Sequence, residues 1–325
     1  MKHLNIPGKS ISQNAISQLG LGTMRMANKS EGIKAIHAAL DSGINFLNTG
    51  DFYDAGLSEM LVGEALKGQD RDKVFVSVKF GGMLKAGGGL YGIDSRPELI
   101  ENYLTYSLKR LGLDYIDLYQ PCRINPHVPV EETIGAISKL VEKGFVRTIG
   151  ISEIDAATLR RANTIHPISL VEVTYSMMSR KIEDELIPTA RELGIGVVGF
   201  GVLLSGLIGG KNPQQKLEHI SHMVSSSTLE NFNQNIALSN ALEQIANEKN
   251  ATLSQLAIAW VLSQGEDILA LVGSRTAEQV QNTLKALEIS LTKEDLERIE
   301  KILPKEKAQS DYMPVMNLAK NGFFN

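Results

Sequence analysis

Residues 95–121 read SRPELIENYLTYSLKRLGLDYIDLYQP, and this stretch holds both kinds of element from which the chain is built. Ser95 and Pro97 are typical of a helix start, and Gly112 is typical of a helix end. Apolar or small residues recur between them at helical spacing: Leu99, Ile100, Tyr103, Leu104, Ser107, Leu108 and Leu111. The following run, 116–121, is short and apolar, which indicates a buried strand.

The same alternation of helical patterns and short apolar runs continues along the chain. The next helical pattern places Ile134, Ile137, Leu140 and Val141 on one face and ends before Gly144. Several of the apolar runs are nearly continuous, as expected for parallel strands that are covered on both faces. Eight runs are predicted to be strands: 17–22, 45–49, 74–79, 116–121, 148–152, 170–175, 196–201 and 268–273.

Eight β–α units predict an α/β fold, a closed (β/α)8 TIM barrel that forms a single domain over residues 1–325. The alternative is an open, doubly wound sheet. In that fold a G-x-G-x-x-G turn is expected after the first strand, and the run 17–22 is not followed by one. We therefore expect the barrel.

Two segments go beyond the eight repeats. The stretch 202–265, between the seventh and eighth strands, is too long for a bare loop and shows helical patterns over 228–248 and 252–263. It is predicted to be an insertion over the barrel mouth plus a barrel helix. An extra helix is expected over 292–303. The tail after Pro304, which carries Tyr312, Met313, Phe323 and Phe324, either folds back over the mouth or is a frayed terminus.

Composition excludes several classes of protein. The chain has 325 residues, an apolar fraction of 43% and a formal net charge of −4, with no basic block that would neutralise nucleic-acid phosphates. A single cysteine excludes an intrachain disulfide framework. No secretory h-region and no apolar run of about 20 residues is present, so we expect a cytoplasmic protein. The six histidines lack ligand spacing, and no metal is expected.

Polar residues follow the predicted strands at the end where a barrel carries its active site. This set comprises Thr23, Asn48, Asp51, Tyr53, Lys79, Arg123, Ser152, Glu153, Glu172, Tyr175 and Arg275. Lys79, at the end of an apolar strand, is either partly desolvated in the mouth or extended into solvent. Tyr53 can exchange a proton with a carbonyl oxygen if a lysine lies nearby, and otherwise is a packing residue.

Two further positions have a functional and a plain interpretation. Tyr175 either stacks on a flat ring such as nicotinamide or packs in the core. The turn Gly273-Ser-Arg-Thr276 precedes a helix, where free backbone N–H groups favour an anion and Arg275 adds a charge. The alternative for this turn is an ordinary helix start with an exposed arginine.

Taken together, the motifs resemble the aldo-keto reductase family over nearly the whole chain. They are LGLGTM (19–24), GINFLNTGDFY (43–53), VKFG (78–81), YIDLYQP (115–121), GIS (150–152), YS (175–176), RELGIG (191–196), LAIAW (256–260) and GSR (273–275). Within the family, YQPCR (119–123) and PVEET (129–133) resemble the branch that contains pyridoxal reductases. That family binds NAD(P)H in a barrel without the Gly-rich turn.

The resemblance implies a role for each matching residue. Tyr53 is the general acid, Lys79 lowers its pKa, and Asn48 and Cys122 occupy the other two catalytic positions. Ser152 and Glu172 hold the nicotinamide carboxamide and Tyr175 stacks on its ring. The remaining contacts to NADPH, which is favoured over NADH, come from Gly22, Thr23, Met24, Leu203, Ser205, Leu207, Gly273, Ser274, Arg275, Gln279 and Asn282.

Four positions depart from the family pattern. Asn48 replaces the usual aspartate, so Lys79 is expected to be less compensated. Cys122 replaces the usual histidine; it is a poor donor to a substrate oxygen or simply a small buried residue, and Arg123 substitutes for the histidine if it points inward. Glu153 and Glu172 replace amides, and a carboxylate cannot donate to the carboxamide oxygen.

Three functions remain open at this point. The first is reversible, NADPH-dependent reduction of a small aldehyde or ketone to an alcohol, with Tyr53 and Lys79 as the catalytic pair. The second is a cofactor-binding, redox-sensing subunit with little turnover, which the substitutions at Asn48 and Cys122 favour. The third is a Schiff-base enzyme in which Lys79 is the nucleophile; this would leave Tyr53 unexplained.

Overall fold

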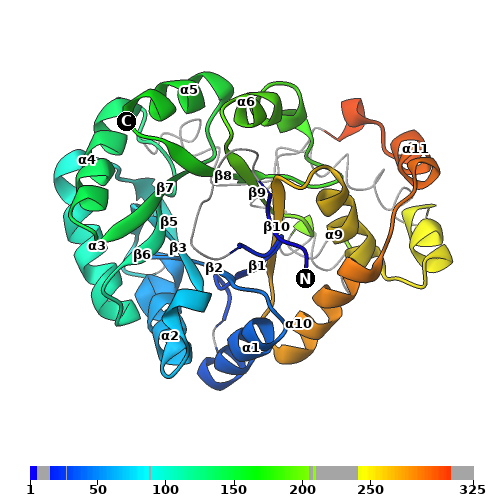
Figure 1. Cartoon of the computed structure of the whole chain (residues 1–325), viewed down its shortest axis with the longest axis horizontal. Coiled ribbons are helices and arrows are strands. Elements are labelled where there is room, and N and C mark those ends of the chain that lie inside the picture. The colour runs from blue at the N-terminus through cyan, green and yellow to red at the C-terminus, as the bar shows by residue number, and fades with distance from the viewer. Residues whose placement is uncertain (6–14, 27, 88, 205–207, 210–240, 309–325) are drawn as a thin grey trace.

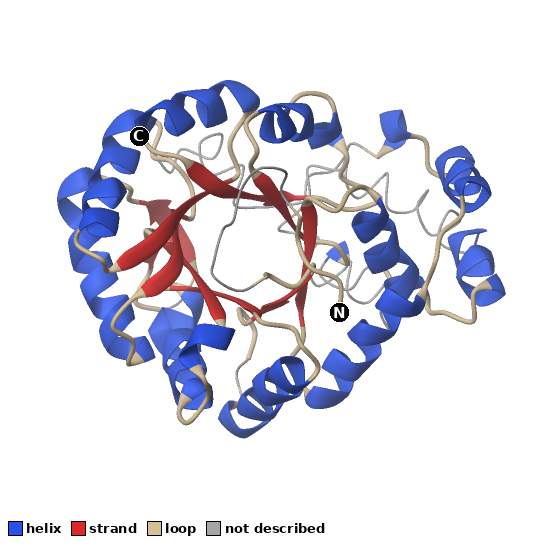
Figure 2. Ribbon diagram, in the orientation of Figure 1, coloured by secondary structure: helices blue, strands red, loops and turns tan. Residues whose placement is uncertain are grey.

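Eight parallel strands close into a barrel with helices around the outside, as the computed structural model shows (Figures 1 and 2). The structure describes residues 1–5, 15–26, 28–87, 89–204, 208–209 and 241–308. The barrel order is β1-β10-β9-β8-β7-β6-β3-β2. The strands are β1 Leu19–Gly22, β2 Phe46–Gly50, β3 Phe75–Phe80, β6 Ile116–Pro121, β7 Val146–Ser152, β8 Ile168–Thr174, β9 Gly196–Phe200 and β10 Ile268–Gly273. The predicted TIM barrel and its eight strands are confirmed.

The helices follow the strands and cover their outer faces. They are α1 Lys29–Asp41, α2 Leu57–Leu66, α3 Pro97–Leu111, α4 Val130–Glu142, α5 Ala156–Ile165, α6 Leu186–Glu192, α9 Leu253–Ser263, α10 Ala277–Leu284 and α11 Lys293–Ile302. The predicted helices over 252–263 and 292–303 correspond to α9 and α11. Of the pattern over 228–248, only 241–248 are described, and these are helical. The tail residues Tyr312, Met313, Phe323 and Phe324 lie outside the described residues.

One predicted helix cap is wrong. The residue before α3 is Arg96, which makes no side-chain cap. The Ser95 hydroxyl instead accepts a hydrogen bond from the backbone N–H of Asn125, at 2.9 Å, in the loop after β6. Pro97 does start the helix, and Gly112 ends it in the left-handed conformation, with φ of 65°.

Inside the barrel, an apolar layer lies below a polar one. Side chains alternate along a strand with a period of two, so residues two apart point to the same side. Phe46, Phe75, Leu118 and Leu170 pack together as the apolar floor, with Ile16, Val198 and Leu269. The next inward positions on the same strands are Asn48, Ser77, Gln120 and Glu172, all buried. The barrel therefore has a closed floor and a polar interior towards the strand C-termini.

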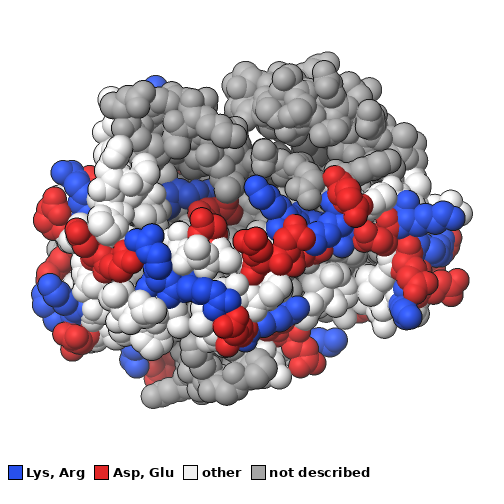
Figure 3. All heavy atoms as spheres, turned by 90° about the horizontal axis from the view of Figure 1, so that it is seen from above, with Lys and Arg blue, Asp and Glu red and all other residues white. Residues whose placement is uncertain are grey.

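A small antiparallel hairpin flanks this polar end. It pairs β4 (Gly82–Leu84) with β5 (Leu90–Ile93), between β3 and α3. Its residues Ile93 and Leu90 pack with Cys122 and Phe52, so the hairpin walls one side of the barrel mouth. On the outer surface, basic and acidic side chains lie next to each other over the face seen in Figure 3.

Candidate active site

The polar layer of the barrel is built around an ion pair between Lys79 on β3 and Glu172 on β8. Lys79 Nζ donates to Glu172 Oε1 at 2.6 Å and to Asn48 Oδ1. Glu172 Oε2 accepts from Asn48 Nδ2 at 2.7 Å and from Gln120 Nε2 at 2.6 Å. Ser77 Oγ accepts from both amides at 3.2 Å. The Lys79 and Glu172 side chains are only 5% and 3% exposed, so the pair is shielded from solvent.

The charge on Lys79 is fixed by its surroundings. Burial works to lower the pKa of Lys79, but the neighbouring Glu172 carboxylate and the Tyr53 hydroxyl together offset this, so that the pKa lies above its ordinary value. The expectation that Lys79 is poorly compensated is therefore wrong: Asn48 carries no charge, and the negative charge comes from across the barrel.

Tyr53 lies beside Lys79 at the end of β2. It starts the 3₁₀ segment η1 (Tyr53–Gly56), and its ring centre is 5.2 Å from Lys79 Nζ. The next two residues, Asp54 and Ala55, have φ of 49° and 53°. Non-glycine residues adopt this left-handed conformation only at some cost, and such strain is concentrated at functional sites. The turn places the tyrosine over the polar layer.

Tyr53 is a protonated phenol at neutral pH. Burial raises the pKa of Tyr53 above its ordinary value, the Lys79 charge opposes this rise, and the Glu172 carboxylate adds to it. The sequence-based expectation of a pKa lowered by Lys79 captures one contribution but not the net direction. A protonated hydroxyl beside a fixed ammonium can act as a general acid.

Cys122 and Arg123 follow β6 at the mouth. Cys122 is 3% exposed and packs with Ile93, and burial raises the pKa of its thiol to about 12. It is a small buried residue, as one of the two interpretations expected. Arg123 reaches the end of the neighbouring strand β7: its Nη1 lies 3.4 Å from Ser152 Oγ and its Nη2 lies 3.8 Å from Glu153 Oε2. The Arg123 guanidinium therefore points inward, at the mouth of the barrel.

A groove opens beside Tyr53, between the loops that follow β1 and β10. It has a volume of about 410 Å³ and is lined by Thr23, Met24, Arg25, Met26, Asp54, Ser58 and Arg275. Gly22 and Gly273 lie opposite each other in the β1–β10 pairing at its base. Two arginines on one groove fit a ligand that carries several phosphates. Arg25 was missed by sequence reasoning because it follows no strand end directly.

The other predicted cofactor contacts are placed less simply. The Ser274 hydroxyl is buried and lies 3.4 Å from Thr283 Oγ1. Gln279 Oε1 accepts from the Arg275 backbone N–H at 2.8 Å, and Asn282 Oδ1 accepts from Gln255 Nε2 at 2.9 Å. Leu203 is partly exposed after β9, whereas Ser205 and Leu207 lie outside the described residues.

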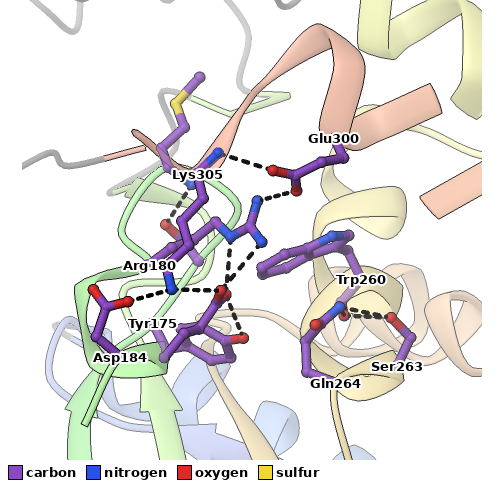
Figure 4. A network of polar contacts seen from close by, with 11 residues as sticks. Tyr175, Arg180, Asp184, Trp260, Ser263, Gln264, Glu300 and Lys305 are labelled. Carbon is purple, nitrogen blue, oxygen red and sulfur yellow. Dashed lines mark hydrogen bonds and ion pairs between the residues drawn. The ribbon is translucent and has the colours of Figure 1, made fainter. Parts of the chain in front are cut away.

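Tyr175 is buried in a network of its own. It is 1% exposed, its hydroxyl donates to Glu183 Oε1 at 2.9 Å, and its ring centre is 5.6 Å from that of Trp260 (Figure 4).

Within the part of the chain that the structure describes, no three His, Cys, Asp or Glu residues are grouped to hold a metal. None of the described helices is long and apolar enough to cross a membrane.

The sequence matches the aldo/keto reductase family over residues 18–304. The chain belongs to this family. Probable aldo-keto reductase 1 of Glycine max is 38% identical over 298 residues, which cover 89% of this chain and 86% of that protein. The match makes the protein an oxidoreductase of carbonyl groups, in agreement with the resemblance stated above.

Solved aldo-keto reductases share the fold. A glycerol dehydrogenase from Gluconobacter oxydans superposes with a TM-score of 0.80 at 27% identity, covering 93% of this chain and 95% of that one. The holo form of an aldo-keto reductase from Bacillus halodurans superposes with a TM-score of 0.73 at 26% identity, covering 95% and 100%.

In this aldo/keto reductase, two of the positions that depart from the family pattern, Asn48 and Glu172, contact the same lysine. Asn48 is neutral and Glu172 is charged, and both contact Lys79. Glu172 was expected to hold the cofactor, but in the structure both of its oxygens are bound inside the polar layer. Gln120 completes this layer and was missed. It lies two residues after the floor residue Leu118, and that spacing could have identified it.

Proposed function

We propose that the protein reduces an aldehyde or ketone to an alcohol with NADPH, reversibly, with Tyr53 as the general acid and Lys79 as its partner. The observation that supports this most directly is the position of Lys79 Nζ, 5.2 Å from the centre of the Tyr53 ring. Tyr53 Oη gives its proton to the carbonyl oxygen, and the ammonium of Lys79 stabilises the charge that develops on the phenol.

The groove beside Tyr53 would hold the cofactor. Arg25 and Arg275 would meet its phosphates, and Thr23 and Met24 also line the groove. NADPH, when bound, supplies the hydride for the carbonyl carbon. Two arginines favour a ligand with an additional phosphate, which is the reason to propose NADPH rather than NADH.

The two other functions have less support. A Schiff-base mechanism needs a neutral lysine, and the pKa of Lys79 is raised by its carboxylate partner. A regulatory subunit without turnover was favoured by the substitutions at Asn48 and Cys122, and the Glu172 ion pair supplies the charge beside Lys79 that Asn48 lacks.

The test follows NADPH and NADH oxidation with a panel of pyridoxal, nitrobenzaldehyde and a quinone. Tyr53→Phe should lower the turnover of any accepted substrate by about 100-fold or more, because the proton donor is lost. The binding of NADPH, followed by fluorescence titration, should stay within about twofold. Tyr106→Phe is the matched control, because Tyr106 is 56% exposed on α3 and should leave turnover unchanged.

Each outcome is informative. NADPH binding without turnover of any panel member would favour the regulatory function. Turnover that survives Tyr53→Phe would exclude Tyr53 as the acid. Absence of NADPH binding would refute the cofactor assignment.

A further inference from the structure

We propose that Glu172 is a positioning residue whose carboxylate is the counter-ion that holds Lys79 beside Tyr53. This inference rests on the proposed function, because it assigns a role in the same proton transfer. It replaces the expectation that Glu172 contacts the cofactor.

The positive charge of Lys79 is balanced by the carboxylate of Glu172. Among the described residues, its Nζ donates to the neutral Asn48 and to the carboxylate of Glu172, and it also interacts with the Tyr53 hydroxyl. Two other titratable groups interact with it from neighbouring elements: Tyr53 from η1 and Cys122 after β6. The Cys122 thiol has a pKa of about 12 and is uncharged at neutral pH. The Asp51 carboxyl, after β2, accepts from the Gly81 N–H and interacts with Glu59 and Arg110.

Both carboxylate oxygens of Glu172 accept hydrogen bonds inside the polar layer. Its Oε1 faces Lys79, and its Oε2 accepts from the amides of Asn48 and Gln120 at 2.7 and 2.6 Å. Asn48 also accepts from Lys79, so that the three side chains form a closed set of contacts. Three of the roughly four hydrogen bonds that a carboxylate can accept are used in this way, and the residue is only 2% exposed. The geometry therefore suits a fixed counter-ion better than a cofactor contact.

The Glu172 carboxylate also determines the direction in which the pH dependence should change. The Glu172 carboxylate acts to raise the pKa of both Lys79 and Tyr53. Without it, whichever of the two groups loses its proton first would do so at a lower pH. The reduction needs both groups protonated, so its rate should begin to fall at a lower pH.

The experiment measures kcat as a function of pH, and the dissociation constant of NADPH, for wild type and Glu172→Gln. The basic limb of the kcat profile should move to lower pH by about one unit or more in the variant. NADPH affinity should stay within about twofold. Asp51→Asn is measured in parallel. Asp51 has a pKa of about 7, and this variant shows how much its ionisation contributes to the kcat profile.

A double variant restores the charge at the other contact of Lys79. In Asn48→Asp/Glu172→Gln the carboxylate returns on β2, where residue 48 already bonds Lys79. The basic limb should move back towards that of wild type. Should Glu172→Gln alone fail to fold, the double variant is expected to recover folding for the same reason.

The proposal is overturned if Glu172→Gln weakens NADPH binding and leaves the limb in place, because Glu172 would then be a cofactor contact. It is also overturned if the double variant recovers neither the profile nor folding. If wild type itself turns over no carbonyl, the proposed function fails instead. The same variants then test the ion pair alone: Glu172→Gln should lower the urea midpoint of unfolding, and the double variant should restore it.

Discussion

Asp51 is a carboxylic acid held at the mouth of the barrel, two residues before Tyr53. Its Oδ2 accepts a hydrogen bond from the Gly81 N–H at 3.2 Å, and its Oδ1 has no hydrogen-bond partner among the residues that the structure describes. Burial raises the pKa of Asp51 to about 7, the Gly81 N–H opposes this, and the nearby Glu59 carboxylate adds to it. The residue is thus protonated in mild acid and charged at pH 8.

This shift predicts a pH-dependent stability. In the folded protein the pKa is about 7, and its ordinary value is 3.8. Between these values the native state binds more protons than the unfolded state, so stability falls as pH rises from about 4 to 7. Asp51→Asn removes the ionisation and should stabilise the protein at pH 8 by at most about 4 kcal/mol. Near pH 4 the gain should be absent. Urea unfolding of both proteins at the two pH values measures it, and an equal difference at both would contradict it.

Some residues of the candidate site could be predicted from the sequence, and others could not. Lys79 and Tyr53 could be predicted, because parallel strands of a barrel end at one mouth. The partner of Lys79 could not, because Glu172 lies 93 residues away and its direction depends on how the barrel closes. A carboxylate at that position also looked like a poor cofactor contact, and only the geometry showed it to be an ion-pair partner.

At the level of elements, strong periodicity gave correct assignments and weak signals did not. Each barrel strand lies within two residues of its predicted bounds, since apolar runs of this kind are easily recognised. The hairpin β4–β5 was missed, because its strands are short and surrounded by glycines. The predicted Ser95 cap of α3 was wrong, because Ser95 bonds a distant loop instead of its own helix.

The contact between α2 and α3 gives a prediction at this scale. A Cβ atom on Gly63 of α2 would lie 2.4 Å from the Leu111 carbonyl oxygen, which is backbone and cannot turn away. Gly63→Ala should therefore destabilise the protein by about 1–3 kcal/mol through overpacking.

Gly135 on α4 is the matched control for this substitution. Its Cβ would meet nothing closer than 4.0 Å. Gly135→Ala should be neutral or stabilise the protein by up to about 1 kcal/mol, because alanine favours helix. Urea unfolding of both variants decides the matter. If the two substitutions had the same effect, the close approach of α2 and α3 would carry no energetic weight.

At the scale of the whole molecule, Arg180 joins segments that are far apart in the chain. It follows β8, and its guanidinium bonds Glu183 at 2.9 and 3.1 Å and Glu300 on α11 at 2.6 Å (Figure 4). It also lies 5.1 Å from the ring centre of Trp260 on α9, and its backbone N–H donates to the carbonyl of Ala308. One side chain thus holds α9, α11 and the loop behind Tyr175 together.

Removing this side chain should cost far more than removing an exposed ion pair. Arg180 is 9% exposed, and Arg180→Ala would remove the closest cation of Glu183 and leave only Lys305 Nζ, 3.9 Å away, so we expect a loss of about 3 kcal/mol in the free energy of unfolding. Arg298 is the control: its side chain is 39% exposed and pairs with Glu248, so Arg298→Ala should cost no more than about 1 kcal/mol. Urea unfolding at pH 7 compares them. Equal losses would mean that Arg180 is one more surface pair and does not hold α11 to the barrel.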